Sequence, residues 1–243
     1  MSKMVPVPSN SIVPERDIDK PPVLETHHLG IDFGGLTAVD DFTLTVGRTE
    51  IAGLIGPNGA GKTTVFNLLT NVYSPTRGVI LLDGHNTTRK STPQLSKMGI
   101  ARTFQNIRLF ADMTVMDNVR VGLHNSIKQS FAESVTHLFG YRNSERQSKK
   151  DALELLDFFH MADLADKQAG SLPYGEQRRL EIVRALATKP LIILLDEPAA
   201  GMNPSETAEL MENIRHIRDS FKIAVMLIEH DMNLVMNVCE GIC

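Results

Sequence analysis

The clearest structural signal in this chain is Gly56-Pro57-Asn58-Gly59-Ala60-Gly61-Lys62-Thr63. It matches G-x-x-x-x-G-K-S/T, a pattern typical of a loop that binds nucleotide phosphates. The glycines let the backbone curl, so that successive N–H groups point inward and form a nest for anionic oxygens. Lys62 is predicted to place its charge on the β- and γ-phosphates, and the Thr63 hydroxyl to ligate Mg²⁺.

The residues on either side of this loop favour the same interpretation. The run 50–55 before it is apolar and of strand length, and the segment from Thr63 to Leu69 after it is predicted to be a helix. The positive N-terminal end of such a helix faces the same phosphates. The alternative is a chance glycine-rich turn, which does not require all four fixed positions in a strand–loop–helix context.

Composition narrows the class of protein. The chain has 243 residues, with 25 basic and 29 acidic side chains and a net charge of −4. This balance leaves no electrostatic footprint for nucleic acid, so we expect no nucleic-acid partner. The longest aliphatic run, Leu191–Leu195, is far shorter than the roughly 20 residues of a membrane-spanning helix. The only cysteines, Cys239 and Cys243, are predicted to be cytosolic thiols.

The pattern along the chain predicts one large α/β domain after a tail. Residues 1–22 are polar and proline-rich and are predicted to be disordered. Strands are predicted at 23–26 and 42–46. Strands that then alternate with helices predict a parallel sheet, interrupted by a helical insert at about 112–175. Residues 126–148, the least periodic part, are predicted to be a peripheral connection.

Local signals predict two further details. Asp83-Gly84 after a predicted strand indicates a hairpin turn, so Asp83 is interpreted as a turn residue. Asn203-Pro204-Ser205-Glu206 is typical of a helix start, with Asn203 as the N-cap. The buried face of that helix is predicted to consist of Leu210, Ile214, Ile217 and Phe221.

A second motif places two carboxylates after a buried strand. Leu191–Leu195 is wholly apolar, and Asp196 and Glu197 follow it. Open α/β sheets bind their ligands at the carboxyl ends of such strands. Asp196 is predicted to hold Mg²⁺, and Glu197 to orient and deprotonate the attacking water. The alternative, an ordinary exit from strand to loop, is weakened by the phosphate loop upstream.

From residue 23 to its end, the chain resembles the nucleotide-binding subunit of an ATP-binding cassette (ABC) transporter. Gly56–Thr63 resembles the Walker A motif of that family, and Leu191–Glu197 resembles its Walker B motif. Gln105 matches the Q-loop glutamine, which senses Mg²⁺ and touches the transmembrane partner. His230 matches the switch histidine that hydrogen-bonds the γ-phosphate. Phe33 matches the aromatic that stacks on adenine, although it also suits a strand residue that fills the core.

The resemblance implies a P-loop NTPase (ABC ATPase) core, an antiparallel β-subdomain and an inserted helical subdomain. The core would comprise residues 23–111 and 176–243. ATP and Mg²⁺ are the implied cofactors. The implied catalytic residues are Lys62, Gln105, Glu197 and His230. The implied metal ligands are Thr63, Gln105 and Asp196. The implied nucleotide contacts are Phe33, Gly56, Pro57, Asn58, Gly59, Ala60, Gly61, Lys62, Thr63, Thr64, Tyr174, Gly175 and Glu176.

The chain departs from the family pattern at two places. The signature Leu-Ser-Gly-Gly-Gln is here the segment 172–176, in which Pro173 lacks both the serine hydroxyl and an N–H. Gly175 and the helix N-terminus still offer N–H groups to a phosphate on an opposite subunit. Asn203 replaces the D-loop aspartate, and both helix capping and a role across a dimer interface suit it.

Three segments resemble one subfamily, the larger (G-type) ATP-binding component of branched-chain amino acid importers. They are 102–110, 172–182 and 229–232. The implied partners are a second ABC ATPase subunit in a homo- or heterodimer, two integral-membrane permease subunits and, indirectly, an extracytoplasmic amino-acid-binding protein. The implied location is the cytoplasmic face of the inner membrane.

Two other functions and one structural expectation stay open at this point. The alternatives are an ABC ATPase for another substrate, such as lipid or lipopolysaccharide export, and an ABC ATPase acting on ribosomes or DNA. Single-cassette length and the absence of a heptad run disfavour the latter. The family continues past the switch histidine with a further strand, a hairpin and a helix. We therefore expect an incomplete C-terminal part, with an uncovered sheet edge near 223–228 or at the neighbouring strand.

Overall fold

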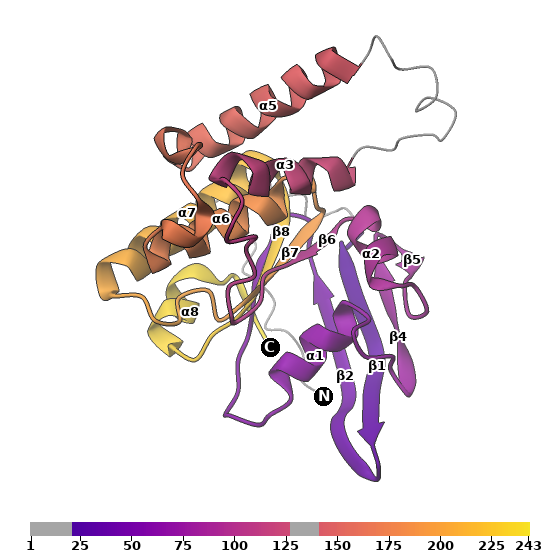
Figure 1. Ribbon diagram of the computed structural model, residues 1–243. Coiled ribbons are helices and arrows are strands. Elements are labelled where there is room, and N and C mark those ends of the chain that lie inside the picture. Colours follow the sequence, from indigo (N-terminus) through magenta and orange to yellow (C-terminus); the bar gives the residue numbers. More distant parts are fainter. Residues whose placement is uncertain (1–20, 127–140) are drawn as a thin grey trace. The chain divides into compact units, whose positions relative to one another are not determined.

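The computed structural model describes residues 21–126 and 141–243 (Figure 1). The predictions for residues 1–20 and 127–140 lie outside the described residues. The chain divides into two compact units. The first contains the chain up to Gln105 together with Pro190–Cys243, and the second contains Asn106–Lys189. The predicted limits of the core and the helical subdomain stay predictions.

The first unit contains the predicted parallel sheet. Its strand order is β6-β7-β8-β3-β9, and each neighbouring pair is parallel. The central strands are buried along their whole length, which explains their continuous apolar sequence. The strands are β3 (Ile51–Leu54), β6 (Ile100–Arg102), β7 (Ile192–Asp196), β8 (Ala224–Ile228) and β9 (Gly241–Ile242).

The prediction of an uncovered edge near residues 223–228 or at the neighbouring strand is wrong, because β8 and its neighbours β7 and β3 each pair on both sides. Strand β8 lies inside the sheet between β7 and β3. On its other side β3 pairs with β9, through Ala52 with Gly241 and Gly53 with Ile242. The two residues of β9 are enough to form this pairing, so the edge strands of the described sheet are β6 and β9.

The same unit contains an antiparallel sheet with the order β2-β1-β4-β5. Strand β1 is longer than predicted. Its register with β2 shifts three times, and His28 in β1 and Asp41 in β2 have positive φ. These irregularities interrupt the period-two pattern on which the prediction depended. Asp83 and Gly84 both have positive φ in the turn between β4 and β5, which confirms the predicted hairpin. The strands are β1 (Leu24–Phe33), β2 (Leu36–Val46), β4 (Arg77–Leu82) and β5 (His85–Asn86).

The helices of this unit are α1 (Lys62–Leu69), α2 (Thr92–Met98), α7 (Pro204–Phe221) and α8 (Met232–Val238). The predicted start of α7 is confirmed, because Oδ1 of Asn203 accepts hydrogen bonds from the N–H groups of Ser205 and Glu206. The predicted burial of Phe221 is wrong, since its side chain is 37% exposed. Phe221 ends the helix, and the chain turns away at Lys222 in a left-handed conformation.

One hydrophobic core joins the two sheets of the first unit. Phe66, Leu68 and Leu69 of α1 lie within it, together with inward-facing residues of β1, β4, β7 and β8. The helix that follows the phosphate loop is therefore packed into this core. Burial of its apolar side chains fixes where the loop lies.

The second unit is helical. Helix α3 (Val115–Ser126) packs against α5 (Tyr141–Phe158) and α6 (Tyr174–Leu186), and two 3₁₀ turns, Ala162–Leu164 and Ala169–Ser171, connect α5 to α6. Gly122 permits the close approach of α3 to α6, because an added Cβ would lie 2.5 Å from the carbonyl oxygen of Arg184. Residues 141–148, which belong to the predicted peripheral connection, are the first turns of α5.

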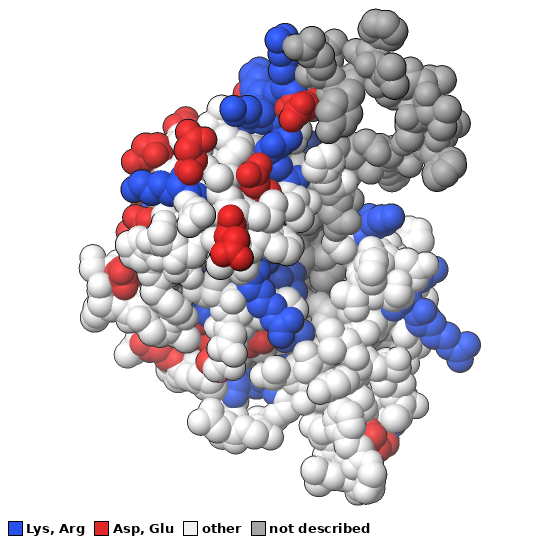
Figure 2. All heavy atoms as spheres, viewed as in Figure 1, with Lys and Arg blue, Asp and Glu red and all other residues white. Residues whose placement is uncertain are grey.

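The surface matches the balanced charge of the chain. On the face drawn in Figure 2, Lys and Arg are interspersed with Asp and Glu. Among the helices that the structure describes, none is long and apolar enough to cross a lipid bilayer.

Candidate functional site: a phosphate loop and two carboxylates at one sheet edge

Four parallel strands deliver the phosphate loop, Gln105, Asp196, Glu197 and His230 to one edge of the sheet. Strand β3 leads into the loop 56–63, and β6 leads toward Gln105. Strand β7 ends at Asp196 and is followed by Glu197, and β8 is followed by Glu229 and His230. The carboxyl ends of parallel strands lie on one side of a sheet, so these groups share an edge.

The phosphate loop wraps around the side chain of Lys62. Its Nζ donates to the carbonyl oxygens of Gly56, at 2.7 Å, and of Pro57, at 2.9 Å. Gly59 and Gly61 have φ of 83° and 85°, a conformation that favours glycine. An added Cβ at Gly61 would also lie 2.7 Å from the carbonyl oxygen of Ala38. The loop therefore depends on glycine for both its turn and its packing.

Helix α1 begins at Lys62, one residue before the predicted start, and Thr63 and Thr64 lie in its first turn. The helix geometry leaves the first N–H groups without an intrahelical acceptor, so they point toward the loop. Thr63 is exposed there, at the place where its hydroxyl is predicted to ligate a cation. Asn58, Gly59 and Ala60 are the exposed tip of the loop.

Asp196 forms a buried ion pair that sequence reasoning missed. Its Oδ2 accepts a hydrogen bond from Nη2 of Arg102 at 2.9 Å, and the two side chains are 4% and 6% exposed. The Nη1 of Arg102 donates to Asn67 and Thr70, at 2.8 and 3.2 Å. Arg102 therefore connects the carboxylate after β7 to the helix of the phosphate loop.

Two aromatic rings enclose the same guanidinium group. Its central carbon lies 5.6 Å from the ring centre of Phe66 and 4.9 Å from that of Phe104. Such contacts favour arginine over lysine. Arg102 stood in the sequence only three residues before Gln105. Its hydrogen-bond partners lie 32 to 94 residues away, so no local signal identified them.

Glu197 contacts two other predicted site residues. Its Oε2 accepts a hydrogen bond from Nε2 of Gln105 at 2.8 Å, and its Oε1 lies 2.6 Å from Nε2 of His230. The backbone of Glu197 has a φ of 48°, and its N–H donates to the carbonyl oxygen of Ile228 at 3.0 Å. This left-handed conformation directs the chain out of β7 beside the end of β8.

Glu229 is a second residue that sequence reasoning missed. Its Oε1 accepts from the N–H of Ala199 at 2.9 Å, and its Oε2 accepts from the N–H of His230 at 3.3 Å. Burial raises the pKa of the Glu229 carboxyl, and these backbone hydrogen bonds act in the opposite direction. Glu229 therefore ties the segment of His230 to the loop that follows Glu197.

Phe33 lies at the tip of the β1–β2 hairpin. Phe33 is 44% exposed. The alternative interpretation, that it fills the core, is therefore wrong. Gly34 and Gly35 form the turn, both with positive φ. The ring of Tyr73 contacts Phe33 edge to face, with ring centres 5.2 Å apart.

The signature segment belongs to the second unit. Pro173 is the N-cap of α6, and the first helical hydrogen bond runs from the N–H of Gln177 to the carbonyl oxygen of Pro173. The first-turn N–H groups of Tyr174, Gly175 and Glu176 thus precede the intrahelical hydrogen bonds. The fully buried Arg178 lies 3.3 Å from the Tyr174 hydroxyl and pairs with Glu181 at 2.9 Å.

A glycine-rich phosphate loop between a parallel strand and a helix, with carboxylates at the same sheet edge, defines the class of P-loop nucleotide triphosphatases. Within that class, the family model described as "ABC transporter" matches residues 39–200, about two thirds of the chain. The chain therefore belongs to the ABC transporter family. It is a transporter ATPase, which hydrolyses ATP to drive transport.

Several relatives are similar over nearly the whole chain. The high-affinity branched-chain amino acid transport ATP-binding proteins BraF of Pseudomonas aeruginosa and LivG of Escherichia coli are each 44% identical over 91% of this chain and 87% of their own. The lipopolysaccharide export system ATP-binding protein LptB of Escherichia coli is 35% identical, over 89% of this chain and 84% of its own.

A solved structure confirms the fold. The ADP conformation of an ATP-binding cassette of an ABC transporter superposes with a TM-score of 0.78, at 29% identity, over 92% of this chain and 87% of the other. The predicted α/β core with an antiparallel β-subdomain and a helical insert is thereby confirmed.

Proposed function

We propose that this chain is the ATP-binding subunit that energises an importer of branched-chain amino acids. The observation that carries the proposal is the 44% identity, over 91% of the chain, with two proteins named for the transport of these amino acids. The partners in this proposal are a second ABC ATPase subunit, two permease subunits and an amino-acid-binding protein. The chain would work at the cytoplasmic face of the membrane.

In this proposal the loop 56–64 binds the phosphates of ATP, and Phe33 stacks on the base. Support comes from the curled loop, from its position at the start of α1, and from the exposed ring of Phe33. Lys62 donates to two loop carbonyls and would exchange them for phosphate oxygens. A hydrogen bond from a charged donor to a phosphate oxygen is stronger than one to a neutral carbonyl oxygen, so this exchange is favourable.

The side chains around the loop suit Mg²⁺. A threonine hydroxyl, a glutamine amide and an aspartate carboxylate supply the hard oxygen ligands that this cation prefers. Arg102 binds Oδ2 of Asp196, and no described residue donates a hydrogen bond to Oδ1. Thr63, Gln105 and Asp196 would hold the ion, with Asp196 acting directly or through water. When bound, Mg²⁺ would neutralise charge on the β- and γ-phosphates.

Glu197 is proposed to orient the attacking water and to take its proton. Gln105 and His230 hold one carboxylate oxygen each, so the carboxylate has a defined orientation. The water attacks the γ-phosphorus, the bond to the β–γ bridging oxygen breaks, and the proton passes to Glu197. ADP and inorganic phosphate are the products.

The site is proposed to be completed by a second ATPase subunit. The first turn of α6, at Tyr174, Gly175 and Glu176, would direct N–H groups toward the γ-phosphate bound by that subunit. Pro173 adds neither a hydroxyl nor an N–H to this contact. We therefore expect this signature segment to contribute less than one that carries serine.

The proposal is tested by purifying the complex from membranes of cells that make the full chain. We expect two integral-membrane subunits and a second ATPase to co-purify, and ATPase activity in proteoliposomes to rise with a leucine-loaded binding protein. The variant Glu197→Gln should assemble the same complex without uptake. Co-purification with ribosomes and no membrane subunit would contradict the proposal.

A second candidate is the energising subunit of a lipopolysaccharide exporter, supported by the 35% identity with LptB. The same purification separates the two. Membrane subunits that extract lipopolysaccharide, with no response to amino acids, would favour the exporter.

A further inference from the structure

Two exposed aromatic rings pack against each other beside the tip of the β1–β2 hairpin. Phe33 ends β1 and Tyr73 follows α1, and their rings are 44% and 39% exposed. The ring planes meet at 77°, with centres 5.2 Å apart. Edge-to-face packing of this kind restrains a ring while leaving one of its faces accessible.

Tyr73 is hydrogen-bonded through its backbone to α1, the helix that follows the phosphate loop. The N–H groups of Val72 and Tyr73 both donate to the carbonyl oxygen of Asn67 in α1, at 2.9 and 3.1 Å. Helix α1 begins at Lys62 and is packed into the core. The position of the Tyr73 ring is therefore tied to the element that carries the phosphate-binding lysine.

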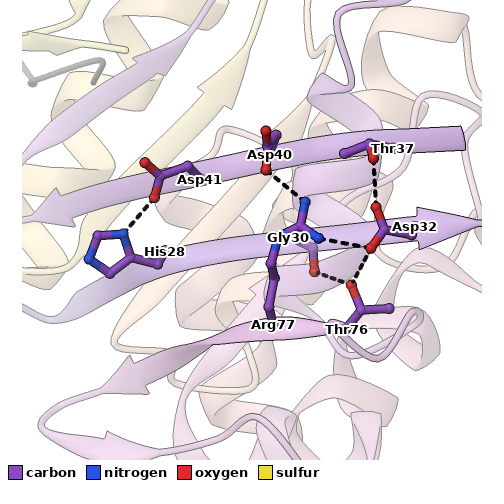
Figure 3. A network of polar contacts seen from close by, with 8 residues as sticks. All are labelled: His28, Gly30, Asp32, Thr37, Asp40, Asp41, Thr76 and Arg77. Atoms are coloured by element: carbon purple, nitrogen blue, oxygen red, sulfur yellow. Dashed lines mark hydrogen bonds and ion pairs between the residues drawn. The ribbon is translucent and has the colours of Figure 1, made fainter.

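The residues after Tyr73 are bound to the strand that ends in Phe33 (Figure 3). The N–H of Thr76 donates to the carbonyl oxygen of Gly30 at 2.9 Å, and its hydroxyl lies 3.2 Å from Oδ2 of Asp32. Nη1 of Arg77 donates to the same Oδ2 at 2.8 Å. Asp32 immediately precedes Phe33, so these bonds fix the backbone next to the ring.

Arg77 also reaches the second strand of the hairpin. Its Nη2 donates to Oδ1 of Asp40 in β2 at 2.6 Å, so one guanidinium holds both β1 and β2. Figure 3 shows its side chain lying across Gly30. An added Cβ at Gly30 would lie 2.6 Å from Nε of Arg77, so glycine gives the side chain room to pass. A hydrogen bond from Thr37 holds the other oxygen of Asp32 and lowers the pKa of that carboxyl.

We propose that Tyr73 and Arg77 are positioning residues for the base of ATP: Tyr73 supports the ring of Phe33, and Arg77 fixes the hairpin that presents it. This inference rests on the proposed role of Phe33. It assigns the positioning of the base-stacking ring to a unit that joins the β1–β2 hairpin to the end of α1. Neither residue belongs to the phosphate loop or to the group around Glu197.

The test compares two ligands by calorimetry on the full chain, MgATP and Mg-tripolyphosphate, since only the first has a base. Tyr73→Leu removes the ring, whereas Tyr73→Phe keeps it. We expect Tyr73→Leu to raise the Kd for ATP about three- to tenfold, the range of an aromatic pair, and to change that for tripolyphosphate less than about twofold. Tyr73→Phe should bind both ligands as the unaltered chain does.

Arg77→Gln independently tests the ion pairs of Arg77 with Asp32 and Asp40. We expect a smaller rise in the Kd for ATP alone, of about two- to fivefold, since these ion pairs are partly exposed. Asp41→Asn is the matched control, because it removes the charge from a nearby contact on the same two strands, in which Nδ1 of His28 lies 2.5 Å from Oδ1 of Asp41. This control should bind both ligands normally.

Phe33→Ala separates the role of Phe33 from the roles of Tyr73 and Arg77. If it weakens ATP while Tyr73→Leu and Arg77→Gln do not, the positioning inference is overturned and the role of Phe33 stands. If Phe33→Ala leaves ATP affinity unchanged, the proposed role of Phe33 fails, and this inference fails with it. An equal loss of both ligands in Tyr73→Leu and in Arg77→Gln would also overturn it, since phosphate binding does not involve the base.

A spectroscopic readout reports on Tyr73 itself. The chain contains no tryptophan and only three tyrosines, so tyrosine emission is observable directly. We expect ATP to change this emission and tripolyphosphate to leave it unchanged, with the ATP response lost in Tyr73→Phe. An unchanged response in Tyr73→Phe would show that the base does not bind beside Tyr73 and would overturn the inference.

Discussion

Nε2 of His230 lies 2.6 Å from Oε1 of Glu197, although the two residues are 33 positions apart in the chain. Neighbouring strands β7 and β8 end side by side and bring them together. With Gln105 on the other oxygen, this contact orients the carboxylate that is proposed to receive the proton of the attacking water.

Removal of this imidazole is therefore expected to slow hydrolysis. We predict that His230→Ala lowers kcat on the order of 100-fold, the usual effect of losing one well-placed group around the reacting atoms. ATP binding should persist, because the phosphate loop is unaltered. Steady-state ATPase assays check this, with His27→Ala on β1 as the control. Unchanged kcat in His230→Ala would refute a role for this contact.

The buried pair of Arg102 and Asp196 leads to a stability prediction. Arg102→Met leaves Asp196 buried without its partner, which is expected to lower the free energy of unfolding by about 3–5 kcal/mol. The double variant with Asp196→Asn should recover much of this loss, because the charge is gone. Urea unfolding measures both.

Arg48→Met is the control for that series, because it breaks the more exposed pair of Arg48 with Asp83. It should lower the free energy of unfolding by no more than about 1 kcal/mol. Equal effects of Arg48→Met and Arg102→Met would contradict the importance assigned to burial.

Glu229 predicts a pH dependence. Its pKa is raised in the folded chain above the ordinary 4.5, so the folded state binds the proton more tightly than the unfolded state. The stabilisation from this proton is full below about pH 4.5 and is lost as pH rises through the folded pKa. Glu229→Gln removes the titration. The free energy of unfolding of the unaltered chain, relative to Glu229→Gln, should thus fall with rising pH. A flat difference from pH 4 to 8 would refute it.

Pro173 predicts a gain of function. Pro173→Ser adds a hydroxyl and an N–H at the N-cap of α6, and one additional hydrogen bond strengthens association by about two- to tenfold. We expect tighter ATP-dependent association with the partner ATPase subunit, measured by sedimentation. Pro173→Ala, which adds only the N–H, should give a smaller gain. Equal association in all three proteins would show that this position does not contact the phosphate.

Much of the fold was predictable because its signals are local. The glycines and Lys62 of the loop, the apolar run before Asp196, and the cap at Asn203 each act through residues within a few positions. The family and the parallel core followed from them, and the comparisons confirm both. The same locality explains the error at Phe221, since helical periodicity does not reveal where the chain turns away.

The remaining features depend on contacts between distant segments. Arg102 meets Asp196 across 94 positions, and Arg77 meets Asp32 across 45. The sequence alone does not distinguish a strand arginine that is exposed to solvent from one that pairs with a buried carboxylate. Glu229 was likewise visible only as the neighbour of His230, and its bond to Ala199 depends on how β7 and β8 align.

Single-turnover hydrolysis by Glu197→Gln in the assembled complex tests directly whether Glu197 is the catalytic base. The amide cannot take a proton but keeps the size of the side chain. We predict that ATP binds with nearly unchanged affinity, that hydrolysis falls at least about 100-fold, and that the ATP-bound dimer accumulates. Hydrolysis at the rate of the unaltered chain would contradict the assignment of Glu197 as the base.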